Sequence, residues 1–243
     1  MNQAMRLTPD ELIIFEIGSL SVSATFVFTW LLMLLMAGGA WLITRRLSSD
    51  VRISPAQNVL EIIVMGIRDQ ISAMGVKRPE LYMPFVGTLF LFIAVSNIFA
   101  AILPGFQAPT GSLSTTVALA FAVFVAVPIY GISQRGLGGY LRQYIEPTPL
   151  MLPMNVIGEF SRTVALAFRL FGNVMSGSLI VGMLLMLAPF FFPVVMRLLG
   201  LLTGLVQAYI FGVLAMVYIA SATRVARGES DDVQPEATAT KAV

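Results

Sequence analysis

Long apolar runs separated by short polar segments give the sequence its main pattern. A helix of ~17–25 predominantly apolar residues crosses the hydrocarbon layer of a membrane. The pattern predicts such spans at about 22–43, 83–102, 113–130, 157–188 and 194–222. The last two are longer than an upright crossing needs, so we expect them to tilt or to project beyond the bilayer. Pro189 and Pro193 separate these two runs and predict a helical hairpin.

Residues 55–75, between the first two spans, show a different pattern. Apolar residues recur there at helical spacing, at Val59, Ile63, Ile67 and Ile71, and polar and charged residues lie between them. This spacing predicts an amphipathic helix that lies along the membrane surface. A helix packed on the other spans has the same pattern, and the two interpretations are compatible. The residues before the first span are polar to amphipathic, and we expect them at the surface.

Composition supports a membrane protein. The 243 residues are 57% hydrophobic and only 12% charged, whereas a soluble domain carries about 25% charged residues. We therefore expect an all-α membrane protein, with residues 1–225 as a single transmembrane domain and 226–243 as a flexible cytoplasmic tail. The chain has no cysteine and no histidine, which excludes disulfides, thiol catalysis and the commonest zinc ligands. We predict no cofactor and no metal.

The positions of the basic residues predict the orientation. If the amino terminus lies outside, five spans place residues 45–82, the 130–153 connection and the tail in the cytoplasm. The residues 103–113 on the other side carry no charge. Cytoplasmic connections of membrane proteins are enriched in lysine and arginine. The basic residues of the three cytoplasmic segments include Arg45, Arg46, Arg52, Arg68, Lys77, Arg78, Arg135, Arg142, Arg224 and Arg227.

One charged residue of the fourth predicted span lies within its apolar run, where a charge raises the free energy of inserting the helix into a membrane. Arg169 is the only charged residue between Arg162 and the end of that run. Even the lenient insertion scale gives at least ~2.5 kcal/mol for an arginine at the centre of a membrane helix. An arginine near a helix end can extend to the lipid headgroups, which is the simpler interpretation. The alternative is that Arg169 faces a water-filled path or a carboxylate of a partner.

Small and polar residues line one side of the same helix. Asn173 and Ser176 lie four and seven residues after Arg169, so the three share a face. In the last span, Gln207 is the strongest polar group of a similar stripe. In a hairpin with its break near residue 188, Arg169 and Gln207 lie at about the same depth, and the amide oxygen of Gln207 can accept a hydrogen bond from the guanidinium. Small residues alone can also serve close packing of helices.

These residues occur in a recognisable context. Arg169-Leu-Phe-Gly-Asn173 follows Leu152-Pro-Met-Asn155 and Glu159, and it precedes Gln207-Ala-Tyr-Ile-Phe-Gly. Over about residues 22–225 the chain closely resembles subunit a of F-type ATP synthases. The resemblance implies a membrane stator beside a rotating ring of c subunits, with peripheral-stalk b subunits, the remaining subunits of the complex and membrane lipid as further partners. It implies no nucleotide site on this chain and no nucleic-acid partner, and it places the protein in the bacterial plasma membrane.

The resemblance also implies roles for single residues. Arg169 would be the essential arginine between two aqueous half-channels, because a fixed cation lowers the pKa of a nearby carboxylic acid and so favours release of its ion. An arginine stays charged where a lysine could titrate. Asn173 and Gln207 match family positions that flank this arginine, and Glu159 matches a carboxylate at the cytoplasmic end of the path. We assign Ser176 and Ser178 to the ion pathway as well.

Two positions depart from the pattern of the family. Many members have a glutamate nine residues after the arginine, where this chain has Ser178. Some have a histidine seven residues before the glutamine, where this chain has Gly200. The titratable relay of those members is therefore missing. Proton transport is the expectation, and sodium transport of the kind attributed to the alternate, N-type branch of these ATPases is the alternative.

Other functional classes account for fewer of these sequence features. A stand-alone transporter or channel predicts an internal repeat or a second intramembrane charge, and the sequence shows neither. A membrane enzyme needs a metal cluster, a phosphate loop or a nucleophile elbow, and these motifs are absent. A structural scaffold leaves Arg169 without a role.

Overall fold

The computed structural model describes residues 13–17, 20–45, 55–76, 78–103, 106, 108–145, 151–187 and 192–224. Five of its helices are long and apolar enough to cross a membrane. The predicted all-α membrane fold is confirmed. The helices are α1 (Ala24–Thr44), α2 (Pro55–Ala73), α3 (Pro79–Ile102), α4 (Leu113–Ile145), α5 (Met151–Leu187) and α6 (Phe192–Arg224), and η2 (Pro109–Gly111) is a short 3-10 helix.

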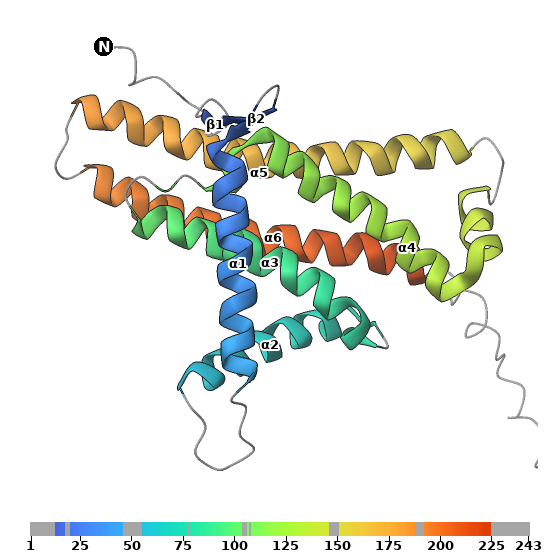
Figure 1. Cartoon of the computed structure of the whole chain (residues 1–243). Coiled ribbons are helices and arrows are strands. Elements are labelled where there is room, and N and C mark those ends of the chain that lie inside the picture. Colours follow the sequence, from blue (N-terminus) through green and yellow to red (C-terminus); the bar gives the residue numbers. More distant parts are fainter. Residues whose placement is uncertain are drawn as a thin grey trace, which may run out of the picture.

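The amino-terminal part differs from a plain surface segment. Strands β1 (Ile13–Ile17) and β2 (Leu20–Ser23) form an antiparallel hairpin that leads directly into α1 (Figure 1). The sequence pattern did not reveal this hairpin. The predicted tail, residues 226–243, lies outside the described residues, and a single domain over residues 1–225 stays a prediction.

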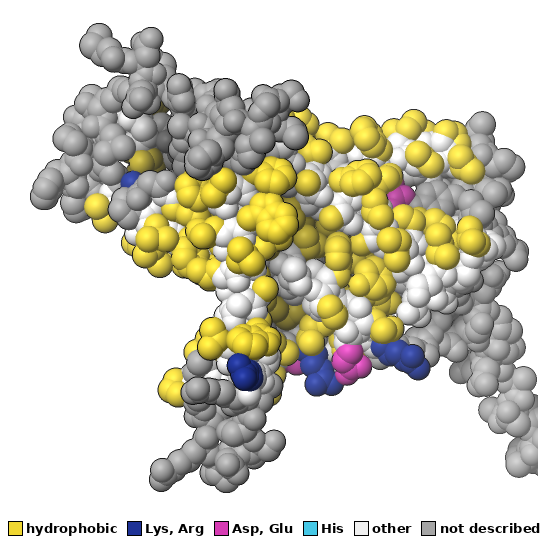
Figure 2. Space-filling view, in the orientation of Figure 1, with side chains coloured by type: hydrophobic (Ala, Val, Ile, Leu, Met, Phe, Trp, Pro, Cys, Tyr) yellow, Lys and Arg dark blue, Asp and Glu magenta, His cyan; other side chains and the backbone are white. Residues whose placement is uncertain are grey.

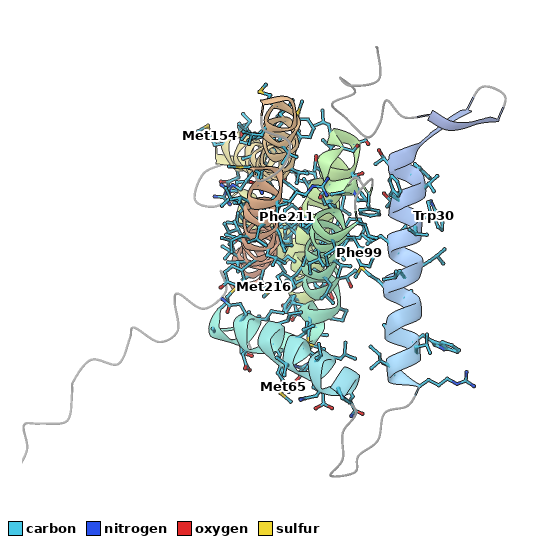
Figure 3. The ribbon with its side chains drawn as sticks, turned by 90° about the vertical axis from the view of Figure 1, so that its left-hand side faces the viewer. Trp30, Met65, Phe99, Met154, Phe211 and Met216 are labelled. Atoms are coloured by element: carbon cyan, nitrogen blue, oxygen red, sulfur yellow. The ribbon has the colours of Figure 1, made fainter. Side chains whose placement is uncertain are left out.

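Helix α1 stands apart from the other spans, and most of its side chains are exposed (Figure 3). Trp30 points away from the bundle, whereas Leu32 is buried. The ring of Phe28 lies 4.9 Å from that of Phe106, in the connection between α3 and α4. Helices α5 and α6 run at a steep angle to α1, side by side as the predicted hairpin (Figure 1). Relative to α1, these two long helices are therefore strongly inclined.

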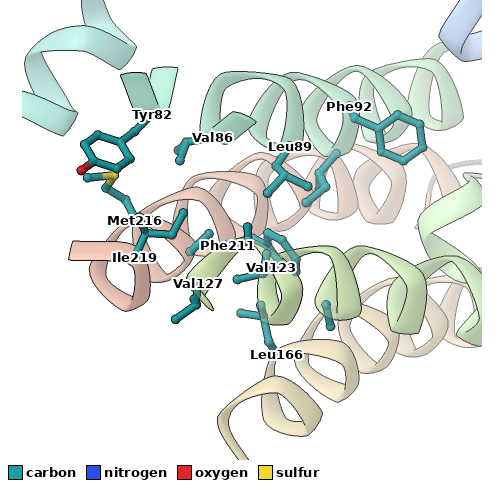
Figure 4. Packing of buried hydrophobic residues seen from close by; sticks show 14 of the residues in the cluster. Tyr82, Val86, Leu89, Phe92, Val123, Val127, Leu166, Phe211, Met216 and Ile219 are labelled. Atoms are coloured by element: carbon teal, nitrogen blue, oxygen red, sulfur yellow. The ribbon is translucent and has the colours of Figure 1, made fainter. Parts of the chain in front are cut away.

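The core of the bundle lies where α3, α4, α5 and α6 meet (Figure 4). Phe211 is fully buried there, among Leu89 of α3, Val123 of α4 and Leu166 of α5. Lipid tails are as apolar as these side chains, so close packing and small residues hold such helices together. At Gly212, for example, an added Cβ would lie 3.6 Å from Phe90 of α3.

Helix α4 extends past the predicted end of its span, to a sharp break at Gly136. This residue has φ 74°, a backbone conformation that favours glycine. Beyond the break the chain folds back, and Tyr140 packs on the backbone of Gly131, where an added Cβ would lie 2.7 Å from the ring. The glycine-rich stretch after residue 135 is therefore a corner between two helical segments.

Helix α2 lies along one end of the bundle, where most charged side chains of the visible face gather (Figure 2). Arg68 of α2 forms an ion pair with Glu80 of α3 at 3.2 Å. Gln70 donates a hydrogen bond to the hydroxyl of Tyr209 of α6 at 2.7 Å. Ile71 is buried, whereas Met65 points away from the bundle (Figure 3). One side of the amphipathic helix α2 thus packs on α3 and α6, and its other side faces away from the bundle.

Candidate functional site

Arg169 lies on the exposed side of α5. Leu166 and Leu170, one turn before and one residue after it, are buried in the core, whereas Phe168 and Arg169 are exposed. The hydrophobic contacts of Leu166 and Leu170 therefore fix the rotation of α5 and aim the arginine out of the bundle. Arg169 lies well inside the candidate span Leu152–Leu184, away from both ends. Its position does not match an arginine that reaches the headgroups from a helix end.

Within the described part of the chain, no carboxylate lies within ion-pair distance of Arg169. The nearby glycines have open surroundings too. A Cβ added to Gly172, Gly177 or Gly200 would meet nothing within 4 Å. These small residues therefore do not serve close packing between helices of this chain, as the simpler interpretation required. They leave a smooth surface on the hairpin beside the unpaired Arg169.

The other residues of the polar face of α5 differ in how far they are exposed. Ser176 is exposed and its hydroxyl donates to the backbone carbonyl of Gly172 at 2.6 Å, while Asn173 is half-buried. Both lie on the same side of α5 as Arg169, as their spacing predicts. Ser178 belongs to α5, and its side chain lies outside the described ones.

Gln207 differs from the expectation. It is only 7% exposed and points into the bundle, and the structure contains no hydrogen bond between its side chain and Arg169. The reason is that Gln207 shares one face of α6 with Gly204 and Phe211, and this face packs on α3. Arg169 faces out of the bundle instead. The prediction of a hydrogen bond between Arg169 and Gln207 is therefore wrong, although both residues belong to the same hairpin.

The depth of the two residues can be followed along the hairpin. The guanidinium of Arg162 on α5 lies 5.8 Å from the ring of Tyr218 on α6. Seven residues on from Arg162 comes Arg169, and seven residues back from Tyr218 comes Phe211. Because the two helices are antiparallel, Arg169 lies near the level of Phe211, and Gln207 is about one helical turn closer to the start of α6. This register favours the predicted similarity in depth.

A polar cavity of about 400 Å³ lies between α4, α5 and α6, on the far side of Arg169 from the turn between α5 and α6. Glu159 lines it, together with Asn155, Arg162 and Thr163 of α5. Ser221 and Tyr218 of α6 close the other side. We call this space the α4–α5–α6 cavity. It places Glu159, the predicted pathway carboxylate, beside a hollow that starts about two turns from Arg169.

Most residues of this cavity were not predicted from the sequence. Arg162 and Thr163 lie near the predicted start of the fourth span, and Ser221 lies near the end of α6, where a charged or hydroxyl residue needs no special explanation. One signal was available: Glu159 and Arg162 are three residues apart and share a helix face with Thr163. Among the described residues, no group of three or more histidines, cysteines or acidic residues could hold a metal ion.

Comparison with known proteins identifies the family. The profile of the family described as ATP synthase A chain matches residues 26–220. The chain belongs to this family. It is 59% identical over 221 residues to ATP synthase subunit a 2 of Acaryochloris marina, with 91% of this chain and 94% of that protein covered. It is 59% identical over 220 residues to ATP synthase subunit a of Albidiferax ferrireducens, covering 90% of this chain and 95% of that protein. ATP synthase subunit a 1 of Chlorobaculum parvum is 58% identical over 220 residues, which cover 90% and 97% of the two chains.

Membership in the ATP synthase A chain family establishes the general role. The chain is a multi-pass membrane subunit of the stator of an F-type ATP synthase. It takes part in ion translocation and works in a complex with other ATP synthase subunits. Membership in this family favours a subunit of a complex over a stand-alone transporter or channel.

Proposed function

We propose that Arg169 is the essential arginine of ion translocation, placed between two half-channels and facing a rotating ring of c subunits. The observation that carries this proposal is the exposure of an unpaired arginine deep within a membrane span. A charge in hydrocarbon needs a partner or water. The smooth surface around Gly172, Gly177 and Gly200 suits a partner that slides past it.

The chemistry follows from the fixed charge. A carboxylate on the ring that comes close to Arg169 is stabilised in its ionised form, because a nearby cation lowers the pKa of a carboxylic acid. The carboxyl group therefore gives up its ion before it passes the arginine and takes up another on the far side. Arg169 also repels cations, so it prevents direct leakage between the two paths. The guanidinium suits this task because it does not lose its proton.

The remaining residues take supporting roles. Glu159 lines the α4–α5–α6 cavity, which we assign to the half-channel on the cytoplasmic side, whereas Asn173, Ser176 and Ser178 follow Arg169 on α5 and belong to the path on its other side. Gln207 lies on the other side of Arg169, inside the bundle. With the amino terminus outside and the carboxyl terminus in the cytoplasm of a bacterium, the basic residues at the end of α1 and on α2 face the cytoplasm. The other partners would be the b subunits and membrane lipid.

The test of this proposal is a matched pair of arginine substitutions. Arg169→Gln in the whole complex should abolish ATP-driven ion pumping into inverted membrane vesicles while the complex still assembles. Arg197→Gln removes an exposed arginine from the beginning of α6 and should leave pumping near the native rate. Equal pumping by both variants would refute a special role of Arg169.

The coupling ion is a separate question. We propose the proton, with sodium as the alternative, since Ser178 and Gly200 stand where other members carry a titratable group. ATP-driven uptake of radioactive sodium, measured with a protonophore present, decides between them. Uptake that persists identifies a sodium pump, whereas protonophore-sensitive acidification without sodium uptake identifies a proton pump.

A further inference from the structure

A second hollow lies between α2, α3 and α6, away from the α4–α5–α6 cavity and from Arg169. It has a volume of about 310 Å³. Its wall is mainly aliphatic and aromatic, and it includes Ile67 of α2, Phe90 of α3 and Met216 of α6. We call this space the α2–α3–α6 groove.

Two polar side chains line the groove, and they satisfy each other. Gln70 of α2 donates a hydrogen bond to the hydroxyl of Tyr209 of α6 at 2.7 Å. A water molecule needs two to four polar partners, and apolar cavities without them stay dry and take up apolar molecules instead. The groove therefore suits a hydrocarbon better than water or an ion.

Glycine keeps the groove open on the side of α2. Gly66 lines it, and a Cβ added at this position would meet nothing within 4 Å. On the opposite wall, a Cβ added to Gly212 of α6 would lie 3.6 Å from Phe90, in ordinary contact. A large side chain at position 66 would therefore enter free space and would not collide with a neighbouring helix.

The groove lies where the tails of membrane lipids can reach it. Its walls on α3 and α6 belong to two candidate membrane spans, and α2 runs along the charged end of the bundle (Figures 1 and 2). Ile62 and Tyr209 at its wall are 63% and 47% exposed, so the groove is open on one side. It thus begins just inside the level of the charged surface.

The size of the groove restricts what can fill it. A helix with its side chains is about 10–12 Å wide, so one turn of about 5.4 Å occupies roughly 400–600 Å³. This is more than the 310 Å³ of the groove. An unbranched alkyl chain is much thinner and fits. The groove therefore favours the acyl chain of a lipid over a helix of another subunit.

An ion pair beside the groove indicates the head group. Arg68 follows the lining residue Ile67, and Glu80 lies six residues before Val86, about 9 Å along α3. The side chains of Arg68 and Glu80 are 56% and 66% exposed, so both can reach a further partner. A head group with a phosphate and an ammonium carries the complementary charges, and each forms a charge-assisted hydrogen bond with one member of the pair.

We propose that the α2–α3–α6 groove holds an acyl chain of a phospholipid with a phosphate and an ammonium in its head group, as in phosphatidylethanolamine. The phosphate lies at Arg68 and the ammonium at Glu80. The lipid fills the space between α2 and the two spans and holds α2 against the bundle. This inference goes beyond ion translocation and does not depend on Arg169.

Photolabelling of the whole complex tests the site. The complex is reconstituted in phosphatidylcholine vesicles that contain a small fraction of phosphatidylethanolamine with a diazirine in one acyl chain. After illumination, mass spectrometry measures the label on α2 and α6 relative to the label on α4. Gly66→Leu fills the groove, and Gly66→Ala fills it in part. Gly38→Leu makes the same change on α1, also with nothing within 4 Å of the added Cβ, and is the matched control.

We expect Gly66→Leu to lower the labelling of α2 and α6 at least about threefold, because the leucine occupies the space of the acyl chain. Gly66→Ala should give a smaller decrease, which keeps the test valid if Gly66→Leu fails to assemble, and Gly38→Leu should give none. Unchanged labelling in both Gly66 variants would overturn the site. Absence of label from α2 and α6 in the native complex would also overturn it, since another subunit then covers the groove.

A second probe tests the head group. Phosphatidylglycerol with the same diazirine chain has the phosphate and lacks the ammonium. We expect it to label α2 and α6 less than phosphatidylethanolamine does, and equal labelling would overturn the role of Glu80. The label is measured without ATP, so a failure of the proposed role of Arg169 would leave these results unchanged.

Discussion

The α4–α5–α6 cavity lies on one side of Arg169, and a layer of buried polar residues lies on the other; the two are built differently. This buried polar layer consists of Ser96, Asn97, Thr110 and Gln207, and the hydroxyls of Ser96 and Thr110 have no hydrogen-bond partner in the described part of the chain. The cavity is a hollow with charged side chains in its wall, Glu159 and Arg162. The layer contains only neutral groups, and each of its residues is at least nine-tenths buried. Charges inside a membrane are costly, whereas neutral polar groups with water are less so. The comparison teaches that a chain can lack charged relay groups on one side and still offer polar contacts there.

The two regions also differ in how the helices meet. At the layer, the backbone of α6 touches a side chain of α3 at Gly204. At the cavity, α4, α5 and α6 diverge enough to leave about 400 Å³ between them. We therefore expect substitutions in the layer to affect assembly first, and substitutions in the cavity to affect transport first.

The largest effect should come from filling the closest contact of the layer. Gly204→Ala places a Cβ at 2.6 Å from Cγ of Asn97, so the two helices must move apart. Overpacking of this kind costs ~1–3 kcal/mol. We expect a lower thermal midpoint for dissociation of the purified complex. Gly39→Ala, on α1 at a position with nothing within 4 Å, is the control and should leave the midpoint unchanged. Equal midpoints for both would show that the α3–α6 contact is looser than described.

A smaller effect is expected from removing the negative charge of Glu159 from the α4–α5–α6 cavity. Glu159→Gln keeps the size of the side chain and removes its charge. We expect ATP-driven pumping to slow about tenfold with normal assembly, less than the ~10²–10⁴-fold contribution of a positioned proton-transfer group, because water in the cavity still carries the ion. Glu61→Gln, on α2 and outside the cavity, should pump normally. A normal rate for Glu159→Gln would mean that the cavity is not part of the path.

Removing both unpaired hydroxyls of the layer should slow pumping by a few-fold. The double variant Ser96→Ala, Thr110→Val loses two polar contacts for water and keeps the local volume. Thr116→Val is the control, since the hydroxyl of Thr116 is already bonded to the carbonyl of Leu113. If the control slowed pumping as much as the double variant, the effect would reflect packing rather than water. Initial rates of acidification or sodium uptake provide the readout.

The smallest effect belongs to a contact outside both regions. Tyr209→Phe removes the hydrogen bond that Gln70 of α2 donates to α6. Hydrogen bonds between membrane helices average ~0.6 kcal/mol. We expect less than about a twofold change in pumping, together with a small drop in the thermal midpoint. A loss of pumping as large as that of Glu159→Gln would show that α2 controls the position of α6.

Much of the fold was predictable because a membrane restricts the choices. The length of each apolar run gives the spans, and Pro189 and Pro193 mark the hairpin. The break at Gly136 and the return of Tyr140 onto Gly131 were not predictable, since they depend on a tertiary contact. The β1–β2 hairpin was missed because its strands are short and mixed in composition.

The site was predictable where a charged residue stands in an apolar span. Arg169 is costly in a membrane span and was found for that reason. The burial of Gln207 was missed, because the face that α6 turns toward α3 is set by Gly204 and Phe211, and the sequence alone does not show which stripe packs inward. The unpaired hydroxyls of Ser96 and Thr110 look like ordinary serine and threonine in the sequence.

The central claim is that a fixed positive charge separates two paths through the membrane. The most direct test is Arg169→Ala in the whole complex, with two readouts: ATP-driven pumping, and passive ion flux through membranes from which the catalytic sector has been stripped. We predict that pumping is lost while passive flux persists or increases, because the two paths then communicate. Normal pumping, or a loss of passive flux in a fully assembled complex, would contradict the claim.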